Sequence, residues 1–212
     1  MSLKLMSHGT MFDLLNPTPE MINMDEIAHS LDHTCRFGGA CSQFYSVAEH
    51  SMAGAFIAYE DALIGDHGLH DLYRLNLAKA FLLHDAAEAY IGDIPTPVKI
   101  LLGDQVLDME SRIMDCIYKK LWPEYFGLSE GDLASLQADV KRIDVIMLSI
   151  ERNFLMPEHK DWVMHLPTLK KGTVSAAWMS NRFLVGDVMP GNRADGFKRF
   201  YHQLFVDGKL TG

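Results

Sequence analysis

The chain has 212 residues, of which 48% are hydrophobic, and its formal net charge at pH 7 is −9. This length and composition allow one domain with a sizeable core. The negative charge argues against a dedicated nucleic-acid surface, because proteins bind duplexes through clustered cations. No run of eighteen apolar residues occurs, and the first residues lack the pattern of a secretory signal, so we expect a soluble, cytoplasmic protein without a membrane span.

Hydrophobic periodicity predicts an all-α fold, because apolar residues recur at helical spacing while strand-like alternation is nearly absent. The stripe of Val106, Met109, Ile113 and Ile117 is one example. The expected helices cover residues 24–33, 46–60, 71–91, 96–102, 104–121, 130–156, 173–184 and 192–206.

The three cysteines, Cys35, Cys41 and Cys116, are odd in number and lack paired CxxC spacing. Reduced thiols are therefore expected rather than a disulfide framework or a zinc ribbon.

Ser46 and Glu49 have the spacing of a capping box, which begins a helix and places His50 near its N-terminus. A lone histidine on such a helix is more often a satisfied polar group than a metal ligand. His50 becomes a candidate metal ligand only in combination with the polar residues that follow it along the chain.

The pair His84 and Asp85 lies within an apolar run from Ala80 to Glu88, and charged groups are rarely buried unless they are paired or bound to a metal. On a continuous helix over 71–91, both side chains would reach one ion, and Glu88 would project one turn further along the same side. A second His-Asp pair, at 70 and 71, lies in a turn-like stretch. We expect Asp71 to cap the helix and His70 to be inert.

The segment 92–97 contains one glycine and two prolines and is predicted to be a turn after this helix. Further on, Asp144 stands beside an apolar stripe in the helix over 130–156. Two ligands from one helix leave a first-row metal short of donors, so His50 and Asp144 are the candidates that complete one site. Two imidazoles and two carboxylates suit one divalent ion such as Mn, Co, Ni, Fe or Zn.

The order His, His-Asp, Asp resembles that of the HD-domain metal-dependent phosphohydrolases. The detail is similar to their 5'-deoxynucleotidase branch, which is close to the phage-type deoxynucleoside triphosphohydrolases. Four blocks carry the resemblance, at residues 25–39, 44–51, 84–99 and 140–144. It implies a single HD-type helical domain over 1–212, with a motif core over about 22–155 and a helical extension over about 156–212.

The resemblance also implies roles for residues in these blocks. His50, His84, Asp85 and Asp144 would bind the metal. Glu88 would be the general acid or base, and Asp93 a polar contact to the sugar or water. Arg36 and Lys99 would bind phosphate, and Phe37 would contact substrate. Without this context, Arg36 and Lys99 would be read as solvated surface cations.

The expected function is metal-dependent removal of the 5'-phosphate from (deoxy)nucleoside monophosphates. One alternative is a triphosphohydrolase that releases nucleoside and tripolyphosphate. A second is a non-catalytic metal-binding regulatory protein, and a third is a helical interaction module without metal. The expected partner is a small nucleotide, and the apolar helix faces are compatible with a homodimer or a higher homo-oligomer.

Overall fold

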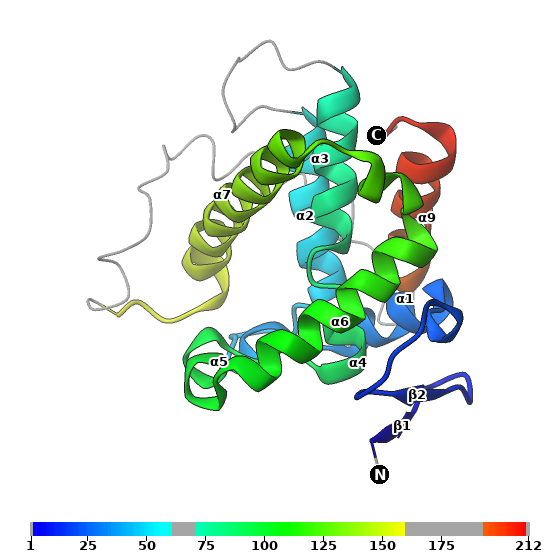
Figure 1. The fold of residues 1–212 in the computed structure, drawn as a ribbon. Coiled ribbons are helices and arrows are strands. Elements are labelled where there is room, and N and C mark those ends of the chain that lie inside the picture. The colour runs from blue at the N-terminus through cyan, green and yellow to red at the C-terminus, as the bar shows by residue number, and fades with distance from the viewer. Residues whose placement is uncertain (1, 61–70, 160–192, 211–212) are drawn as a thin grey trace.

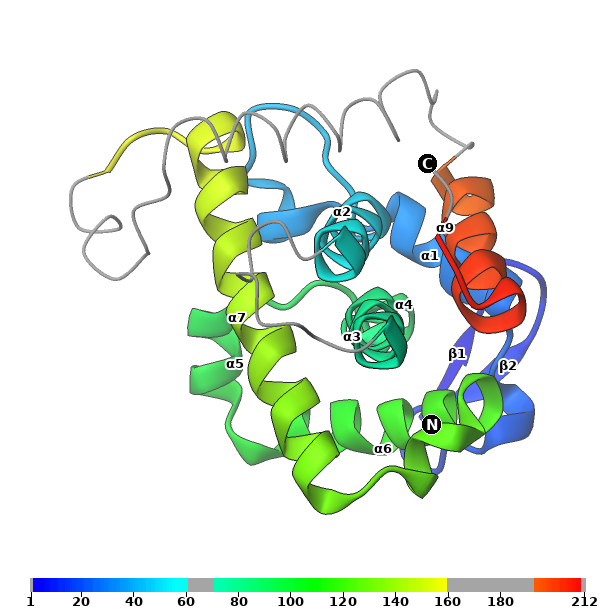
Figure 2. The same ribbon diagram turned by 90° about the horizontal axis from the view of Figure 1, so that it is seen from above.

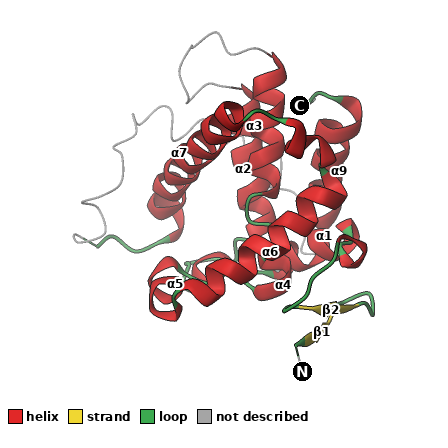
Figure 3. Ribbon diagram, in the orientation of Figure 1, coloured by secondary structure: helices red, strands yellow, loops and turns green. Residues whose placement is uncertain are grey.

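The computed structural model describes residues 2–60, 71–159 and 193–210, and helices dominate them (Figures 1 and 3). The main elements are β1 (Leu3–Leu5), β2 (Met11–Asp13), α1 (Met24–His33), α2 (Val47–Glu60), α3 (Asp71–Leu83), α4 (Glu88–Ile91), α5 (Thr96–Leu102), α6 (Asp104–Leu121), α7 (Glu130–Leu155) and α9 (Arg193–His202). Short 3-10 turns are η1 (Pro19–Met21), η2 (Arg36–Gly39) and η3 (Pro123–Gly127), and a π-helical turn, η5 (Gln203–Asp207), follows α9. The expected helix over 173–184 and His70 lie outside the described residues.

Helices α2 and α3 form the centre of the molecule, with α1, α6, α7 and α9 around them (Figure 2). The α2 sequence is apolar on nearly all sides, which is typical of a buried helix. Gly54 of α2 has no side chain, and the ring of Phe81 from α3 occupies the space where a Cβ would lie. The two central helices therefore approach closely at this point.

The surrounding helices bury the stripes that the sequence predicts. In α6, Val106, Ile113 and Ile117 face the interior, while Met109 is partly buried. The capping box at the start of α2 is also present. Ser46 Oγ accepts the Glu49 N–H at 3.1 Å, and Glu49 Oε2 accepts the Ser46 N–H at 2.8 Å. The predicted all-α fold is confirmed.

The prediction of one continuous helix over 71–91 is wrong. Helix α3 ends at Leu83, residues 84–87 form turns, and α4 begins at Glu88. His84 Nδ1 lies 2.6 Å from the Phe81 carbonyl oxygen, and the His84 backbone N–H donates to the same oxygen at 3.4 Å. Because the side chain competes for this carbonyl, the regular helical hydrogen-bond pattern stops here. The His-Asp pair thus lies in a turn between two helices.

A two-stranded antiparallel hairpin, β1–β2, was not predicted. Its Phe12 side chain is completely buried and stacks on Tyr90 of α4, with 4.0 Å between ring centroids. Lys4 Nζ donates to the Tyr90 carbonyl at 2.7 Å, at the C-terminal end of α4. The hairpin therefore holds the short helix that follows the His-Asp turn.

Among the described residues, no helix has the length and hydropathy needed to cross a membrane. Cys35, Cys41 and Cys116 are free thiols, as expected.

Candidate active site

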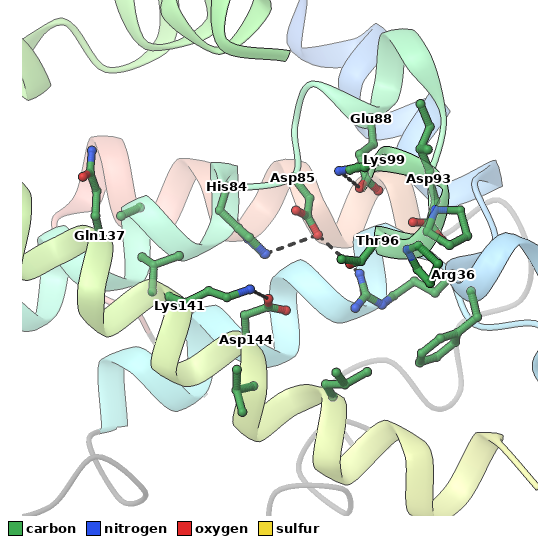
Figure 4. A pocket seen from close by; sticks show the side chains of 18 of the residues that line it. Arg36, His84, Asp85, Glu88, Asp93, Thr96, Lys99, Gln137, Lys141 and Asp144 are labelled. Carbon is green, nitrogen blue, oxygen red and sulfur yellow. Dashed lines mark hydrogen bonds and ion pairs between the residues drawn. The ribbon is translucent and has the colours of Figure 1, made fainter. Parts of the chain in front are cut away.

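The four side chains expected to bind a metal come from three elements: His50 from the first turn of α2, His84 and Asp85 from the turn after α3, and Asp144 from the middle of α7. The structure brings His50, His84 and Asp85 into one cluster, and Asp144 lies beside His50 but outside that cluster. His50 Nε2 lies 3.4 Å from His84 Nε2, 3.7 Å from Asp85 Oδ2 and 3.6 Å from Asp144 Oδ1. His84 Nε2 lies 3.2 Å from Asp85 Oδ2 (Figure 4).

The donor atoms suit a cation. His50, His84 and Asp85 each offer one ligand atom, and these atoms lie within 4.8 Å of one another. The Nδ1–H of His84 donates to the Phe81 carbonyl oxygen, which can only accept, so in the neutral ring Nε2 has the lone pair that a metal needs. Two imidazole nitrogens and two carboxylates are the donor set of a divalent transition-metal site. The residues therefore fit the implied ion.

Glu151 orients His50 from behind and was missed by the sequence analysis. Its Oε1 lies 2.6 Å from His50 Nδ1, and its side chain has no exposed surface. A carboxylate on the far nitrogen of a ligand histidine fixes the ring and its tautomer. The signal was available, because Glu151 lies seven residues after Asp144 and so, at two helical turns, on the same side of α7.

Arg36 lies against the same carboxylates. Its guanidinium donates to Asp85 Oδ2 and to Glu151 Oε2, both at 3.3 Å, and its side chain is only 11% exposed. Burial alone would lower the pKa of Arg36, but Glu151 and Asp85 outweigh it and raise the pKa. Arg36 is therefore a permanent buried cation beside the candidate metal ligands, not a solvated surface group.

The Arg36 loop, which consists of η2 (Arg36–Gly39), has an unusual backbone conformation. Phe37, next to Arg36, has a φ of 58° and so adopts the left-handed conformation that is uncommon outside glycine. The Arg36 guanidinium lies 5.6 Å from the centroid of the Phe37 ring. Asp93 Oδ2 accepts the Gly38 N–H at 3.2 Å, which joins this loop to the segment after α4. Asp93 therefore has a structural contact in addition to its expected role.

Glu88 and Lys99 lie close together, with 3.9 Å between Glu88 Oε1 and Lys99 Nζ. Burial, and then the nearby Asp85 and Asp93 carboxylates, raise the pKa of Glu88 to about 10. Lys99 Nζ also lies 2.6 Å from Glu110 Oε1, a contact that the sequence analysis missed. Burial opposes the charge on Lys99, but the bond with Glu110 raises the pKa of Lys99, which stays protonated.

These groups lie along one cavity of about 900 Å³, which is within the range of small-molecule sites (Figure 4). Of the expected site residues, all but His50 line it. The lining includes Arg36, Phe37, His84, Asp85, Glu88, Asp93, Thr96, Lys99, Tyr118, Tyr125, Gln137, Lys141 and Asp144. Figure 4 shows Arg36 and Asp93 on one side of Asp85, and Gln137 and Lys141 on the other. The cavity therefore has polar side chains on both sides of the candidate metal ligands, within a lining that also contains many apolar residues.

Comparisons with known proteins place the sequence among relatives. The family described as 5'-deoxynucleotidase YfbR-like matches residues 29–125. An uncharacterized protein of Rhodobacter capsulatus is 32% identical over 148 residues, which cover 69% of this chain and 69% of the relative. Uncharacterized protein YfdR of Escherichia coli K12 is 35% identical over 144 residues, which cover 68% of this chain and 66% of the relative.

Among solved structures, the chain is similar to the HD phosphohydrolase DatZ of cyanophage S-2L, which was solved bound to dA and one catalytic Zn²⁺ ion. The sequence identity is 14% and the TM-score is 0.49, and the match covers 88% of this chain and 98% of that chain.

Proposed function

Because the chain belongs to the YfbR-like 5'-deoxynucleotidase family of HD-domain proteins, we propose that it is a metal-dependent phosphohydrolase that removes the 5'-phosphate from deoxynucleoside monophosphates. One observation carries the proposal: two imidazoles and two carboxylates converge beside a buried arginine at one cavity. A purely structural metal site needs no such arginine.

In this proposal His50, His84, Asp85 and Asp144 hold one divalent ion, with Glu151 orienting His50. A divalent ion bound there polarises the phosphoryl group and lowers the pKa of water, which supplies a nucleophile near neutral pH. The protein then contributes mainly positioning and charge neutralisation.

Arg36 is assigned to the phosphate oxygens. Its planar guanidinium presents several N–H donors in a geometry that matches phosphate. Two of its nitrogens contact Asp85 and Glu151, whereas the buried Nε has no hydrogen-bond partner among the described residues. A buried donor without a partner is costly, and a phosphate oxygen could satisfy it once the Arg36 side chain shifts to expose Nε.

Glu88 is assigned to proton transfer. Its side chain is nearly buried at the cavity, and its Oε2 has no hydrogen-bond partner among the described residues. Because this oxygen has almost no accessible surface, we expect a small movement of the Glu88 side chain before it exchanges a proton with the attacking water or with the leaving 5'-oxygen. Lys99, held by Glu110, adds positive charge near Glu88 and the phosphate. Phe37 and Asp93 are assigned to the sugar side of the substrate.

A second candidate reaction is hydrolysis of deoxynucleoside triphosphates to nucleoside and tripolyphosphate. It is favoured by Lys141, which lines the same cavity beyond Asp144 and lies 3.4 Å from its Oδ2. The Lys141 side chain is 76% exposed, so it is free to move toward further phosphate groups. Both reactions break a bond at the 5' phosphorus and can use the same ligands and the same arginine.

Product analysis tests the proposal. The purified protein is loaded separately with Mn, Co, Ni, Fe and Zn and incubated with panels of deoxynucleoside and ribonucleoside mono- and triphosphates. Orthophosphate and nucleoside from the deoxynucleoside monophosphates are the expected products, whereas tripolyphosphate would establish the second reaction. Bound metal without any product would contradict both and indicate a regulatory metal-binding protein. Neither metal nor product would indicate an interaction module.

A further inference from the structure

Two of the three thiols lie in contact beside the Arg36 loop. Cys35 and Cys41 flank η2, and their Sγ atoms are 3.4 Å apart. Both side chains are partly exposed. Cys116 differs, because it is buried and its Sγ lies 3.4 Å from the Pro17 carbonyl oxygen. Of the three thiols, only Cys35 and Cys41 are therefore both close to another thiol and accessible.

We propose that Cys35 and Cys41 are a redox-active dithiol, and that its oxidation to a disulfide lowers turnover by constraining the loop that carries Arg36. The effect on turnover rests on the proposed function, whereas formation of the bond does not. A disulfide has an S–S bond of about 2.05 Å, so the two sulfurs must approach by about 1.4 Å. Such a shift is within reach of side-chain rotation with a small adjustment of the loop.

The reaction is two thiol–disulfide exchanges with a low-molecular-weight disulfide. The Cys35 thiolate attacks one sulfur of this disulfide, its S–S bond breaks, and one thiol leaves. The Cys41 thiolate then attacks Cys35 Sγ, the mixed disulfide breaks, and the second thiol leaves. The protein loses two protons and two electrons, and the small disulfide is reduced to two thiols. Burial and the neighbouring Cys35 raise the pKa of the Cys41 thiol, which favours this order.

The backbone is held at Arg36, directly after Cys35, and at Ser42, directly after Cys41. The Arg36 N–H donates to the Tyr45 carbonyl at 2.9 Å, and the Ser42 N–H donates to the Leu155 carbonyl at 2.7 Å. The Cys41 thiol also lies 3.7 Å from the Arg36 carbonyl oxygen, a contact that the new bond would change. We therefore expect the displacement caused by the disulfide to fall on residues 37–41 and on the Arg36 side chain, and Phe37 and Ala40 of this stretch line the cavity together with Arg36.

The backbone directly after Arg36 has an uncommon conformation and a contact to Asp93 that such a displacement would disturb. Phe37 and Gly38 both have positive φ values, and the Gly38 N–H is held by Asp93. A shift here moves groups assigned to the phosphate and the sugar, but not the elements that carry the metal ligands. We therefore expect a loss of kcat/KM without a loss of metal.

The test uses the full chain loaded with its metal and equilibrated at a series of ratios of reduced to oxidised glutathione. Intact mass should show the loss of two hydrogens, and peptide mapping should show a Cys35–Cys41 link. Along the same series, kcat/KM on the best deoxynucleotide should fall roughly tenfold or more, as small misplacements of binding groups do. Metal content should be constant, and reduction followed by removal of the reductant should restore the rate.

Three variants provide controls. Cys116→Ser should behave as wild type, and Cys35→Ser should form no internal disulfide and keep its rate under oxidising conditions. Cys41→Ser should stop at a mixed disulfide between Cys35 and glutathione, which intact mass detects. Absence of the Cys35–Cys41 link, or a link that leaves kcat/KM unchanged, would overturn the proposal. If the reduced protein hydrolyses no nucleotide, the proposed function fails. The same oxidised and reduced samples then decide the dithiol proposal through mass and through calorimetric affinity for a deoxynucleoside monophosphate.

Discussion

At the scale of single residues, the contact between His50 and Glu151 does most to prepare the candidate metal site. Neither side chain is exposed, and the two lie 101 residues apart in sequence. Burial would raise the pKa of Glu151, but Arg36 and His50 lower it, so the carboxylate is charged in the interior. This charge holds the His50 ring and also positions the Arg36 guanidinium. One residue thus contacts both a candidate metal ligand and the arginine assigned to the phosphate.

We expect Glu151→Gln to weaken metal binding by about 10–100-fold, the range found when the partner of a ligand histidine is changed. Glutamine keeps the volume and can accept one hydrogen bond, but it lacks the negative charge. Metal titration followed by calorimetry measures the effect. Glu130→Gln, an exposed change in the first turn of the same helix, is the control and should bind metal as wild type does. Equal affinities in the two variants would show that Glu151 has no such role.

Arg36 and Glu88 are assigned to chemistry, so their loss should leave the ion in place. Arg36→Ala and Glu88→Gln should purify with normal metal content and hydrolyse deoxynucleotides about 10²–10⁴-fold more slowly. This is the usual contribution of acid–base catalysis, and loss of a charged phosphate contact should have an effect of similar size. Arg112→Ala changes an arginine outside the cavity lining and serves as the control. Loss of metal in either variant, or rates near wild type on every nucleotide, would refute the assignment.

At the scale of elements, helices with strong local signals were predicted well. The α5 and α6 boundaries match the prediction because glycines at 92 and 103 and prolines at 95 and 97 interrupt the chain there. The turn at His84 has no such signal. Its apolar run favours a continuing helix, whereas in the structure the His84 side chain bonds to the Phe81 carbonyl at the point where the helix ends.

Two further features depend on contacts between distant residues. The β1–β2 hairpin has three-residue strands with little pattern of their own, and it is stabilised by packing of Phe12 on Tyr90. Glu110 reaches Lys99 only because α5 folds back on α6. The metal-ligand candidates, by contrast, were found because buried charge in an apolar run is unusual in any fold. Their roles as ligands are still a prediction.

The close approach of α2 and α3 gives a prediction for Gly54→Ala. The added Cβ would overlap the Phe81 ring, whose centroid lies 5.5 Å from that of His50 and 4.3 Å from that of His84. Overpacking of a buried site should lower the free energy of unfolding by about 1–3 kcal/mol. Displacement of the ring should also weaken metal binding. Urea unfolding and metal titration measure the two effects.

Gly131→Ala is the matched control for Gly54→Ala. Gly131 is also in a helix, α7, but its nearest heavy atom to an added Cβ is Ser129 Oγ at 3.9 Å. With room for the methyl group, the higher helix propensity of alanine should raise stability by up to about 1 kcal/mol. A similar response at both positions would contradict the packing argument.

At the scale of the whole molecule, both described ends of the chain pack on α1. The N-terminal segment contacts it through Glu26, and α9 packs against α1 and α2, with Phe197 and Leu204 fully buried near by (Figure 1). The described C-terminal residues therefore share one core with the site. This arrangement supports the proposal of a single domain.

Glu26 links the N-terminal segment to stability at low pH. Its buried carboxylate accepts the Ser7 hydroxyl at 2.6 Å and the His8 N–H at 2.7 Å. Burial opposes the charge, but these bonds lower the pKa of Glu26 below the ordinary 4.5. Its stabilisation is therefore fully present above that value and is lost as the pH falls through the lower folded-state pKa. Glu26→Gln should remove this contribution.

The measurement is urea unfolding of metal-free wild type and Glu26→Gln between neutral pH and about pH 3, below the ordinary glutamate value. Wild type should be the more stable at neutral pH, and the difference should shrink in acid. Glu130→Gln, at an exposed position, should show little difference at any pH. If the difference in free energy of unfolding between wild type and Glu26→Gln does not change with pH, the charged carboxylate is not its cause.

Metal binding should stabilise the entire fold, because one ion would join α2, the turn after α3, and α7. A ligand that binds only the native state at about 100 times its Kd adds about 2.7 kcal/mol, which corresponds to roughly 5–10 °C in Tm for a chain of this size. Chelation should lower the Tm of wild type by this amount, and readdition of metal should restore it.

In Asp85→Asn the Tm should not respond to metal, because Asp85 contacts both imidazoles. Asp93→Asn alters another cavity carboxylate outside the ligand set and should keep the wild-type response. An equal metal-dependent shift in Asp85→Asn would mean that the stabilising ion binds elsewhere, and the candidate site would then lose its main physical support.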